Sequence, residues 1–188
     1  MNDVIQAAVE LQSVCLAEGW QFCFIGGIAV LRWGEPRETV DVDLTLLTGF
    51  GSEAPFIERL LEQFEARVTD ATEFARRNRV LLLRSKKGVG LDVALGALPF
   101  EQRMIERSSL FEYPVNASLR TCSAEDLIVL KAFASRTQDW ADVEHVIVRQ
   151  TDKLDWHYVN EQLVPLVKVK EEPEILDKLG RLRAEFER

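Results

Sequence analysis

The sequence predicts an α+β protein, in which a small mixed β-sheet flanked by helices is followed by a helical C-terminal part. Short apolar runs bounded by glycine or polar residues occur before residue 120, which is typical of strands. From Ser123 onward the apolar residues recur at helical spacing. We therefore expect a mixed core over residues 1–120 and a helical part over residues 121–188.

The core is expected to begin with a helix over residues 3–18, because Val4, Ala8, Leu11 and Cys15 recur at helical spacing before Gly19. The other elements expected here are a strand at 20–25, a short helix at 28–33, a strand at 40–47, a loop at 48–55, a helix at 56–66, strands at 80–83 and 91–95 joined by a hairpin, a short helix at 101–107 and a strand at 115–119.

Four helices are expected in the C-terminal part. Ser123 followed by Asp126 is a variant of the capping box, which marks a helix start. The predicted helices cover residues 124–136, 139–149, 156–169 and 174–187.

Composition is that of an ordinary globular protein, with 188 residues, 47% hydrophobic and 29% charged. The net charge of −8 excludes a global basic footprint for nucleic acid. We expect a cytoplasmic protein, because no apolar run approaches the ~20 residues of a membrane span and the first residues do not resemble a signal peptide. Three cysteines without a CxxC pair fit a reducing compartment and argue against a disulfide framework or a structural zinc site.

Two aspartates on one strand are the strongest candidates for a functional site. Strand side chains alternate between faces, so Asp41 and Asp43 point the same way. If Asp92, in a later apolar run, lies on a neighbouring strand, three carboxylates converge. Such a cluster repels itself unless a cation neutralises it, so we expect Asp41, Asp43 and Asp92 to be metal ligands for Mg²⁺ or Mn²⁺ bound with nucleotide phosphates.

Gly26 and Gly27 precede this acid pair at the end of an apolar run. Glycines permit positive φ and close approach of the backbone to a phosphate, and the start of the following helix adds partial positive charge. A glycine pair alone indicates only a turn. Fourteen residues before an Asp-x-Asp pair, it indicates a nucleotide-phosphate site.

These residues resemble the nucleotidyltransferase superfamily typified by DNA polymerase β, and within it the bacterial stand-alone AbiEii-type proteins. The resemblance covers roughly residues 20–150 and consists of the glycine pair, the block Arg37-x-Thr39-x-Asp41-x-Asp43, Asp92, and a later helix carrying Lys131, Arg136, Asp139 and Asp142. One departure is that many members have Gly-Ser at the turn, with the Ser hydroxyl on a phosphate, where this chain has Gly27.

The resemblance implies a nucleotidyltransferase fold and a Mg²⁺-dependent transfer of a nucleoside monophosphate from a nucleoside triphosphate such as ATP. The acceptor would be a hydroxyl of tRNA, of a protein or of a small molecule. The chain would then be either a toxin with a cognate antitoxin or a lone enzyme.

The resemblance also implies that Lys131 contacts the triphosphate, while Arg37 and Thr39 orient phosphates or carboxylates. The alternatives are a snorkelling Lys131 on a partly apolar helix face and a loop salt bridge for Arg37. Arg136 and Asp139 have a structural alternative as partners at the start of a helix.

Other classes of function remain open at this point. Asp41-x-Asp43-x-Thr45 also matches the haloacid dehalogenase-like phosphatases, whose first Asp is a nucleophile, but those place it after a continuous apolar strand. A metal-dependent glycosyltransferase usually needs a longer chain. A catalytically degenerate module that binds nucleotide or a partner is supported only by the missing turn Ser.

A run of cations provides the last functional signal. Residues 76–87 contain six Lys or Arg and no acid. They are either a solvated helix end and hairpin turn, or a patch that steers phosphates and holds an RNA acceptor.

Overall fold

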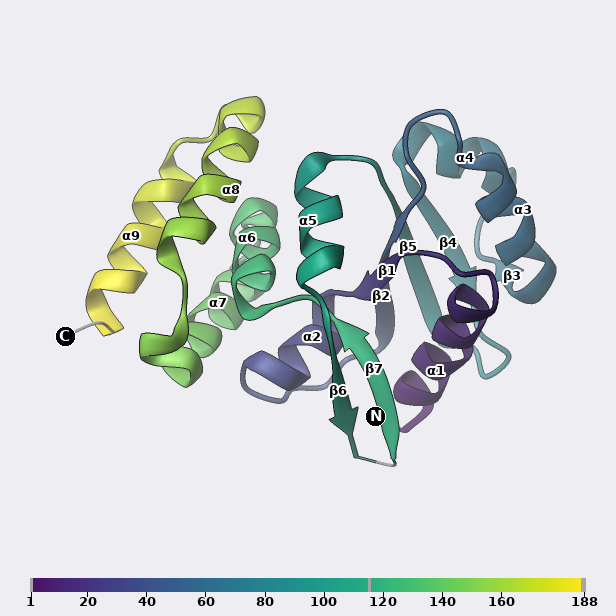
Figure 1. Cartoon of the computed structure of the whole chain (residues 1–188), viewed down its shortest axis with the longest axis horizontal. Coiled ribbons are helices and arrows are strands. Elements are labelled where there is room, and N and C mark those ends of the chain that lie inside the picture. Colours follow the sequence, from purple (N-terminus) through teal and green to yellow (C-terminus); the bar gives the residue numbers. More distant parts are fainter. Residues whose placement is uncertain (1, 115, 187–188) are drawn as a thin grey trace. The chain divides into compact units, whose positions relative to one another are not determined.

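The computed structural model describes residues 2–114 and 116–186. The chain divides into two compact units, the first formed by Met1–Ile28 with Glu38–Cys122 and the second by Ala29–Arg37 with Ser123–Arg188. Figure 1 traces the order of the elements from the purple N-terminal helix to the yellow C-terminal helix.

A mixed seven-stranded sheet forms the centre of the first unit, in the order β3-β4-β5-β2-β1-β7-β6. The pairs β2–β5 and β1–β7 are parallel and the other neighbours are antiparallel. This confirms the predicted mixed sheet. The strands are β1 (Phe22–Phe24), β2 (Asp41–Leu47), β3 (Glu65–Ala66), β4 (Val80–Arg84), β5 (Gly90–Gly96), β6 (Ser109–Tyr113) and β7 (Ala117–Thr121).

Helices of the first unit pack against this sheet. The first unit contains α1 (Asn2–Ala17), the start of α2 (Gly26–Trp33), α3 (Ala54–Gln63), α4 (Ala71–Asn78) and α5 (Pro99–Arg107). The helices α1 and α5 contact β2, while α3 and α4 lie beside β3 and β4 at one edge of the sheet (Figure 1). The predicted stop of α1 is confirmed, because Gly19 has a φ of +67° and Trp20 N–H donates to Cys15 O.

The two central parallel strands present one buried face and one partly open face. Val42, Leu44 and Leu46 of β2 are buried, and so are the alternate residues Leu91, Val93 and Leu95 of β5. The intervening residues Asp41, Asp43, Gly90, Asp92 and Ala94 are half-buried. The apolar face therefore anchors the strands in the core, and the carboxylates lie on the other face.

The second unit contains the four predicted C-terminal helices: α6 (Ala124–Ala134), α7 (Thr137–Gln150), α8 (Trp156–Lys170) and α9 (Glu174–Phe186), with a 3₁₀ turn η1 at Thr151–Lys153. The predicted cap of α6 is confirmed, since Asp126 N–H donates to Ser123 Oγ at 3.1 Å. The Asp126 carboxylate is fully buried and accepts a 2.6 Å hydrogen bond from the Tyr158 hydroxyl, which fixes α8 on α6.

One expected element ends early and two observed elements were not expected. The helix expected at 56–66 ends at Gln63, because Glu65–Ala66 pairs with β4 as strand β3. The helix α4 and the strand β6 were not predicted. The helix α4 has buried alanines four residues apart, at Ala71 and Ala75, whereas four of the five residues of β6 are exposed and show no alternation. Residues 115 and 187, which belong to the strand predicted at 115–119 and the helix predicted at 174–187, lie outside the described residues.

Cys15, Cys23 and Cys122 are buried and lie outside any disulfide. Burial raises the pKa of the Cys15 thiol to about 12. Across the described parts of the chain, no helix combines the length and apolar composition needed to cross a bilayer.

Candidate active site

Sheet register brings the three predicted carboxylates to one face. In the parallel β2–β5 pair, Asp43 lies directly beside Asp92, and Asp41 lies beside Gly90. Neighbouring residues of paired strands point to the same side of a sheet. Asp41, Asp43 and Asp92 therefore share the half-open face, although 49 residues separate Asp43 from Asp92 in the sequence.

The glycine turn packs directly against this strand. Gly26 has a φ of +54°, and a Cβ built on it would lie 2.0 Å from Asp43 Oδ2. A Cβ on Gly27 would lie 2.1 Å from Thr39 Oγ1. The backbone N–H of Ile25 also donates to Asp43 O at 3.0 Å. Both glycines are therefore needed to admit the Asp43 and Thr39 side chains, a role that the sequence did not indicate.

Arg67 is a member of the site that sequence reasoning missed. Its backbone N–H donates to Leu82 O at 2.9 Å, and its guanidinium forms an ion pair with the Asp92 carboxylate. Arg67 directly follows the helix predicted at 56–66, and that position gave no signal of a functional role. Its partner is 25 residues away, so only strand pairing brings the two together.

The Asp92 carboxyl lies in an environment that favours its protonated form. Burial raises the pKa of Asp92 above its ordinary value, and the negative charge of Asp41 adds to this effect. The Arg67 guanidinium opposes both but does not outweigh them. Asp92 consequently accepts a proton more readily than an exposed aspartate would.

The three carboxylates supply only oxygen donors, which is the ligand type that Mg²⁺ and Mn²⁺ prefer. The donor chemistry therefore fits the predicted metal. Within residues 2–114 and 116–186, however, no group of three or more His, Cys, Asp or Glu side chains could hold an ion as it stands. Gathering the trio around an ion requires side-chain movement, and the Asp92 carboxylate is engaged by Arg67.

Two other predicted residues, Arg37 and Lys131, belong to an ion-pair network in the second unit, whose carboxylates are buried. Arg37 makes two bonds to the Asp142 carboxylate, at 2.9 and 3.0 Å. Lys131 Nζ lies 2.9 Å from Asp139 Oδ1 and 2.8 Å from Asp142 Oδ2. Arg136 Nε completes the network 2.6 Å from Asp139 Oδ2. The salt-bridge alternative for Arg37 is therefore present in the fold.

The network keeps its two aspartates ionised. Burial acts to raise the pKa of Asp142, but hydrogen bonds and charges from Arg37 and Lys131 outweigh it and hold that pKa below the ordinary value. The pKa of Asp139 is likewise lowered, because Arg136 and Lys131 outweigh the opposing effect of burial. Lys131 is itself buried, so its ammonium is held at a fixed place in the unit rather than extended into solvent.

The cationic run at 76–87 does not form a single patch. Arg76 and Arg77 lie on α4, whereas Lys86 and Lys87 follow β4, whose five residues span roughly 17 Å. Arg79 is turned inward, where it pairs with Glu53 and donates to main-chain carbonyls. The run therefore combines a helix end, an internal ion pair and a hairpin turn. This arrangement is closer to the expected solvated helix end and hairpin turn than to a patch that steers phosphates.

A glycine turn packed on an acid pair, with a third aspartate on the adjoining strand of a mixed sheet, is the arrangement expected of a nucleotidyltransferase. The model of the family described as "Nucleotidyl transferase AbiEii toxin, Type IV TA system" matches residues 11–186, and the chain belongs to this family. The predicted resemblance is thereby confirmed, and the chain is a nucleotidyltransferase.

Solved structures resemble the fold at low sequence identity. An antigenic nucleotidyltransferase-like protein from Paracoccidioides brasiliensis is 17% identical, with 95% of this chain and 93% of that chain covered and a TM-score of 0.50. The antibiotic-resistance factor ANT(2'')-Ia, in complex with adenylyl-2''-tobramycin, is 17% identical, with 99% of each chain covered and a TM-score of 0.49. No curated protein matches the chain.

Proposed function

We propose that this nucleotidyltransferase transfers a nucleoside monophosphate from a nucleoside triphosphate to an acceptor hydroxyl, with Asp41, Asp43 and Asp92 as the carboxylates of its active site. The observation that carries the proposal is the packing of Asp43 on Gly26, beside Asp92 in the sheet register. A bound Mg²⁺ or Mn²⁺ would neutralise the triphosphate and lower the pKa of the acceptor hydroxyl.

The glycine turn and Thr39 are proposed to hold phosphate oxygens. The first N–H groups of a helix have no intrahelical partner, so those at the start of α2 are suited to donate hydrogen bonds to an anion. The Thr39 hydroxyl lies where a side chain on residue 27 would begin. Thr39 is thus proposed to take the role of the missing Ser.

The proposed reaction is a direct displacement. The acceptor oxygen forms a bond to the α-phosphorus, the bond from the α-phosphorus to the bridging oxygen breaks, and pyrophosphate leaves. The hydroxyl proton passes to a carboxylate oxygen of Asp92 or to solvent. Lys131 is proposed, from the family pattern, to contact the triphosphate from the position that Asp139 and Asp142 fix for it.

Acceptor and partner are proposed by class. The acceptor is a hydroxyl of RNA, with tRNA the leading candidate, of a protein or of a small molecule. The family description places such enzymes among toxins of a type IV toxin–antitoxin system, so a cognate antitoxin is the proposed protein partner. The cytoplasm is the proposed compartment.

The strand position of Asp41 argues against the phosphatase alternative. Asp41 is the first residue of β2, and the residues just before it are not in a strand. A phosphatase nucleophile would instead follow an apolar strand, as stated above. Direct transfer also predicts no phospho-Asp41, so trapping that species by mass spectrometry would favour the phosphatase.

The proposal can be tested with labelled nucleoside triphosphates, Mg²⁺ and mass analysis of cellular RNA and protein after incubation. Asp41→Ala and Asp43→Ala should each abolish transfer while the fold survives, because each change relieves repulsion among the carboxylates. Glu65→Ala, which removes an exposed carboxylate of the edge strand β3, is the matched control and should keep activity. Full transfer by the double Asp variant would refute the proposal.

A further inference from the structure

The Arg67–Asp92 ion pair has a consequence for metal binding. We propose that Arg67 is a built-in counter-cation of the acid cluster, which competes with a divalent metal ion for the Asp92 carboxylate and so sets the metal affinity of the site. The inference rests on the proposed function, because it takes Asp92 to be a metal ligand.

A single row of register positions leads from Arg67 to the acid pair. Arg67 N–H donates to Leu82 O, Leu82 pairs with Asp92, and Asp92 pairs with Asp43. Paired neighbours point to the same side, so Arg67 starts on the face that carries the carboxylates. Its long side chain needs only to cross β4 to reach Asp92 on β5.

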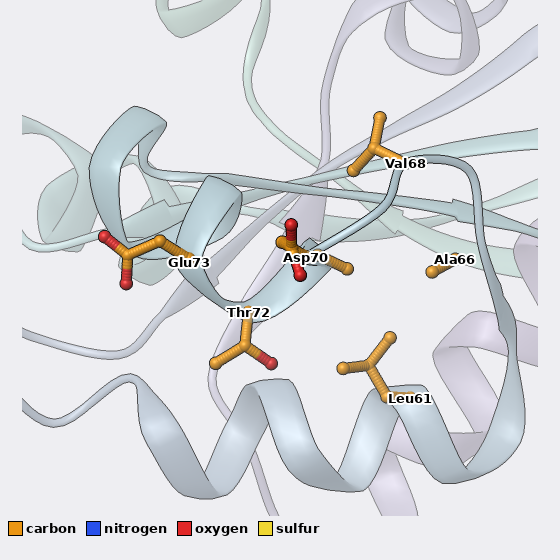
Figure 2. A pocket seen from close by; sticks show the side chains of 7 residues that line it. Leu61, Ala66, Val68, Asp70, Thr72 and Glu73 are labelled. Carbon is orange, nitrogen blue, oxygen red and sulfur yellow. The ribbon is translucent and has the colours of Figure 1, made fainter.

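The neighbours of Arg67 show that its side chain is directed specifically to this face. Ala66 and Val68 line a hollow of about 480 Å³ together with Leu61 of α3, as Figure 2 shows. Arg67 lies between these two residues in the sequence but reaches Asp92 instead. In the segment 66–68, the first and last side chains therefore face the hollow, and the middle one, Arg67, faces the acid cluster.

Gly90 provides the space for the guanidinium. A Cβ at this position would lie 3.0 Å from Arg67 Nη1 and 3.6 Å from Asp41 Cβ. Gly90 also lies beside Asp41 in the β2–β5 register. The guanidinium therefore passes through the gap that the missing side chain leaves next to the acid cluster.

The Arg67–Asp92 ion pair is partly exposed, and one donor of its guanidinium has no hydrogen bond within the described part of the chain. The Arg67 and Asp92 side chains are 27% and 32% exposed, so solvent partly screens their attraction. Arg67 Nε is buried without a hydrogen-bond partner among the described residues, which is a cost of the paired position. A divalent ion binding to Asp92 would displace the guanidinium and release that buried donor.

The competition can be measured without any transfer assay, by titrating the full chain with Mn²⁺ and following free Mn²⁺ by electron paramagnetic resonance. Arg67→Gln should tighten Mn²⁺ binding about tenfold, the equivalent of about 1.4 kcal/mol. The matched control is Arg84→Gln, which removes an exposed charge from the β4 position opposite Gly90 and should leave affinity within about twofold.

A double-mutant cycle assigns the effect to the ion pair. In an Asp92→Asn background, Arg67→Gln should no longer tighten Mn²⁺ binding, since the shared carboxylate is gone. Gly90→Ala is a second approach that retains the charge, because a methyl group 3.0 Å from Nη1 crowds the guanidinium. It should also tighten Mn²⁺ binding, and it keeps the proposal testable if Arg67→Gln does not fold.

The outcomes separate the two proposals. Equal or weaker Mn²⁺ binding by a folded Arg67→Gln, or by Gly90→Ala, overturns the role of Arg67 while the proposed function stands. If neither the parent nor any variant binds Mn²⁺, and Asp43→Ala changes nothing, the proposed metal site itself is overturned.

Discussion

Gly26 offers a sharp test of the site because its missing side chain is what admits Asp43. We predict that Gly26→Ala damages metal binding and transfer far more than it damages folding. The added Cβ would lie 2.0 Å from Asp43 Oδ2, whereas ordinary contact begins near 3.4 Å. The Asp43 carboxylate must therefore move by about 1.4 Å, the difference between these two distances, because the pairing of β2 with β1 and β5 holds its backbone.

Two terms contribute to the expected size of the effect. An alanine at a φ of +54° costs about 1–2 kcal/mol in the left-handed region. In a chain of this length that corresponds to a fall in Tm of roughly 2–8 °C. A misplacement of about 1 Å in a catalytic group costs on the order of 100-fold in rate, so transfer should fall at least that far.

Gly19→Ala is the control that separates the backbone cost of a positive φ from the displacement of Asp43. Gly19 has a φ of +67° and no atom within 4 Å of an added Cβ, so it shares the backbone cost without the collision. Both variants are compared by thermal unfolding, Mn²⁺ titration and transfer of labelled nucleotide. Both variants should lose Tm, with the larger fall in Gly26→Ala because its added Cβ also lies 2.8 Å from Asp43 Cβ, and only Gly26→Ala should lose transfer and Mn²⁺ affinity. Full transfer and parental Mn²⁺ affinity in Gly26→Ala would refute the packing of Asp43 as a requirement of the site.

Three further predictions follow from the buried groups. Lys131→Ala should destabilise the protein by about 3 kcal/mol in urea unfolding, because it leaves two buried carboxylates short of a partner; parental stability would contradict the network. The pKa of Asp142 in the folded protein lies below the ordinary value of about 3.9, which it regains on unfolding. The ionised Asp142 therefore contributes its full stabilisation above about pH 5, and this contribution is lost as the pH falls through about 3.9 and then through the folded-state pKa. Asp142→Asn should therefore flatten the loss of stability in acid, and an unchanged profile would exclude this source. Burial raises the pKa of Cys15 to about 12 and all three cysteines are buried, so none should react with a thiol reagent at pH 8 until the protein unfolds.

The sequence alone determined the class of the protein and most of its elements. Apolar periodicity located the four C-terminal helices and predicted strands at 40–47 and 91–95, close to the observed β2 and β5, because a buried face repeats at the period of its element. The Asp-x-Asp pair and the glycine turn could be identified because both are local in sequence. These same local residues were sufficient to indicate a nucleotidyltransferase.

Only the tertiary structure decided which distant groups meet. Strand register placed Asp92 beside Asp43 and brought Arg67 to Asp92, while the strand β6, exposed at four of its five residues, left no alternating signal in the sequence. The structure also showed that Gly26 and Gly27 do more than form a turn, because the absence of their side chains leaves room for Asp43 and Thr39. Periodicity reports which face of an element is buried, but ion pairs and close packing depend on which elements become neighbours, and sheet pairing settles that between residues far apart in the chain.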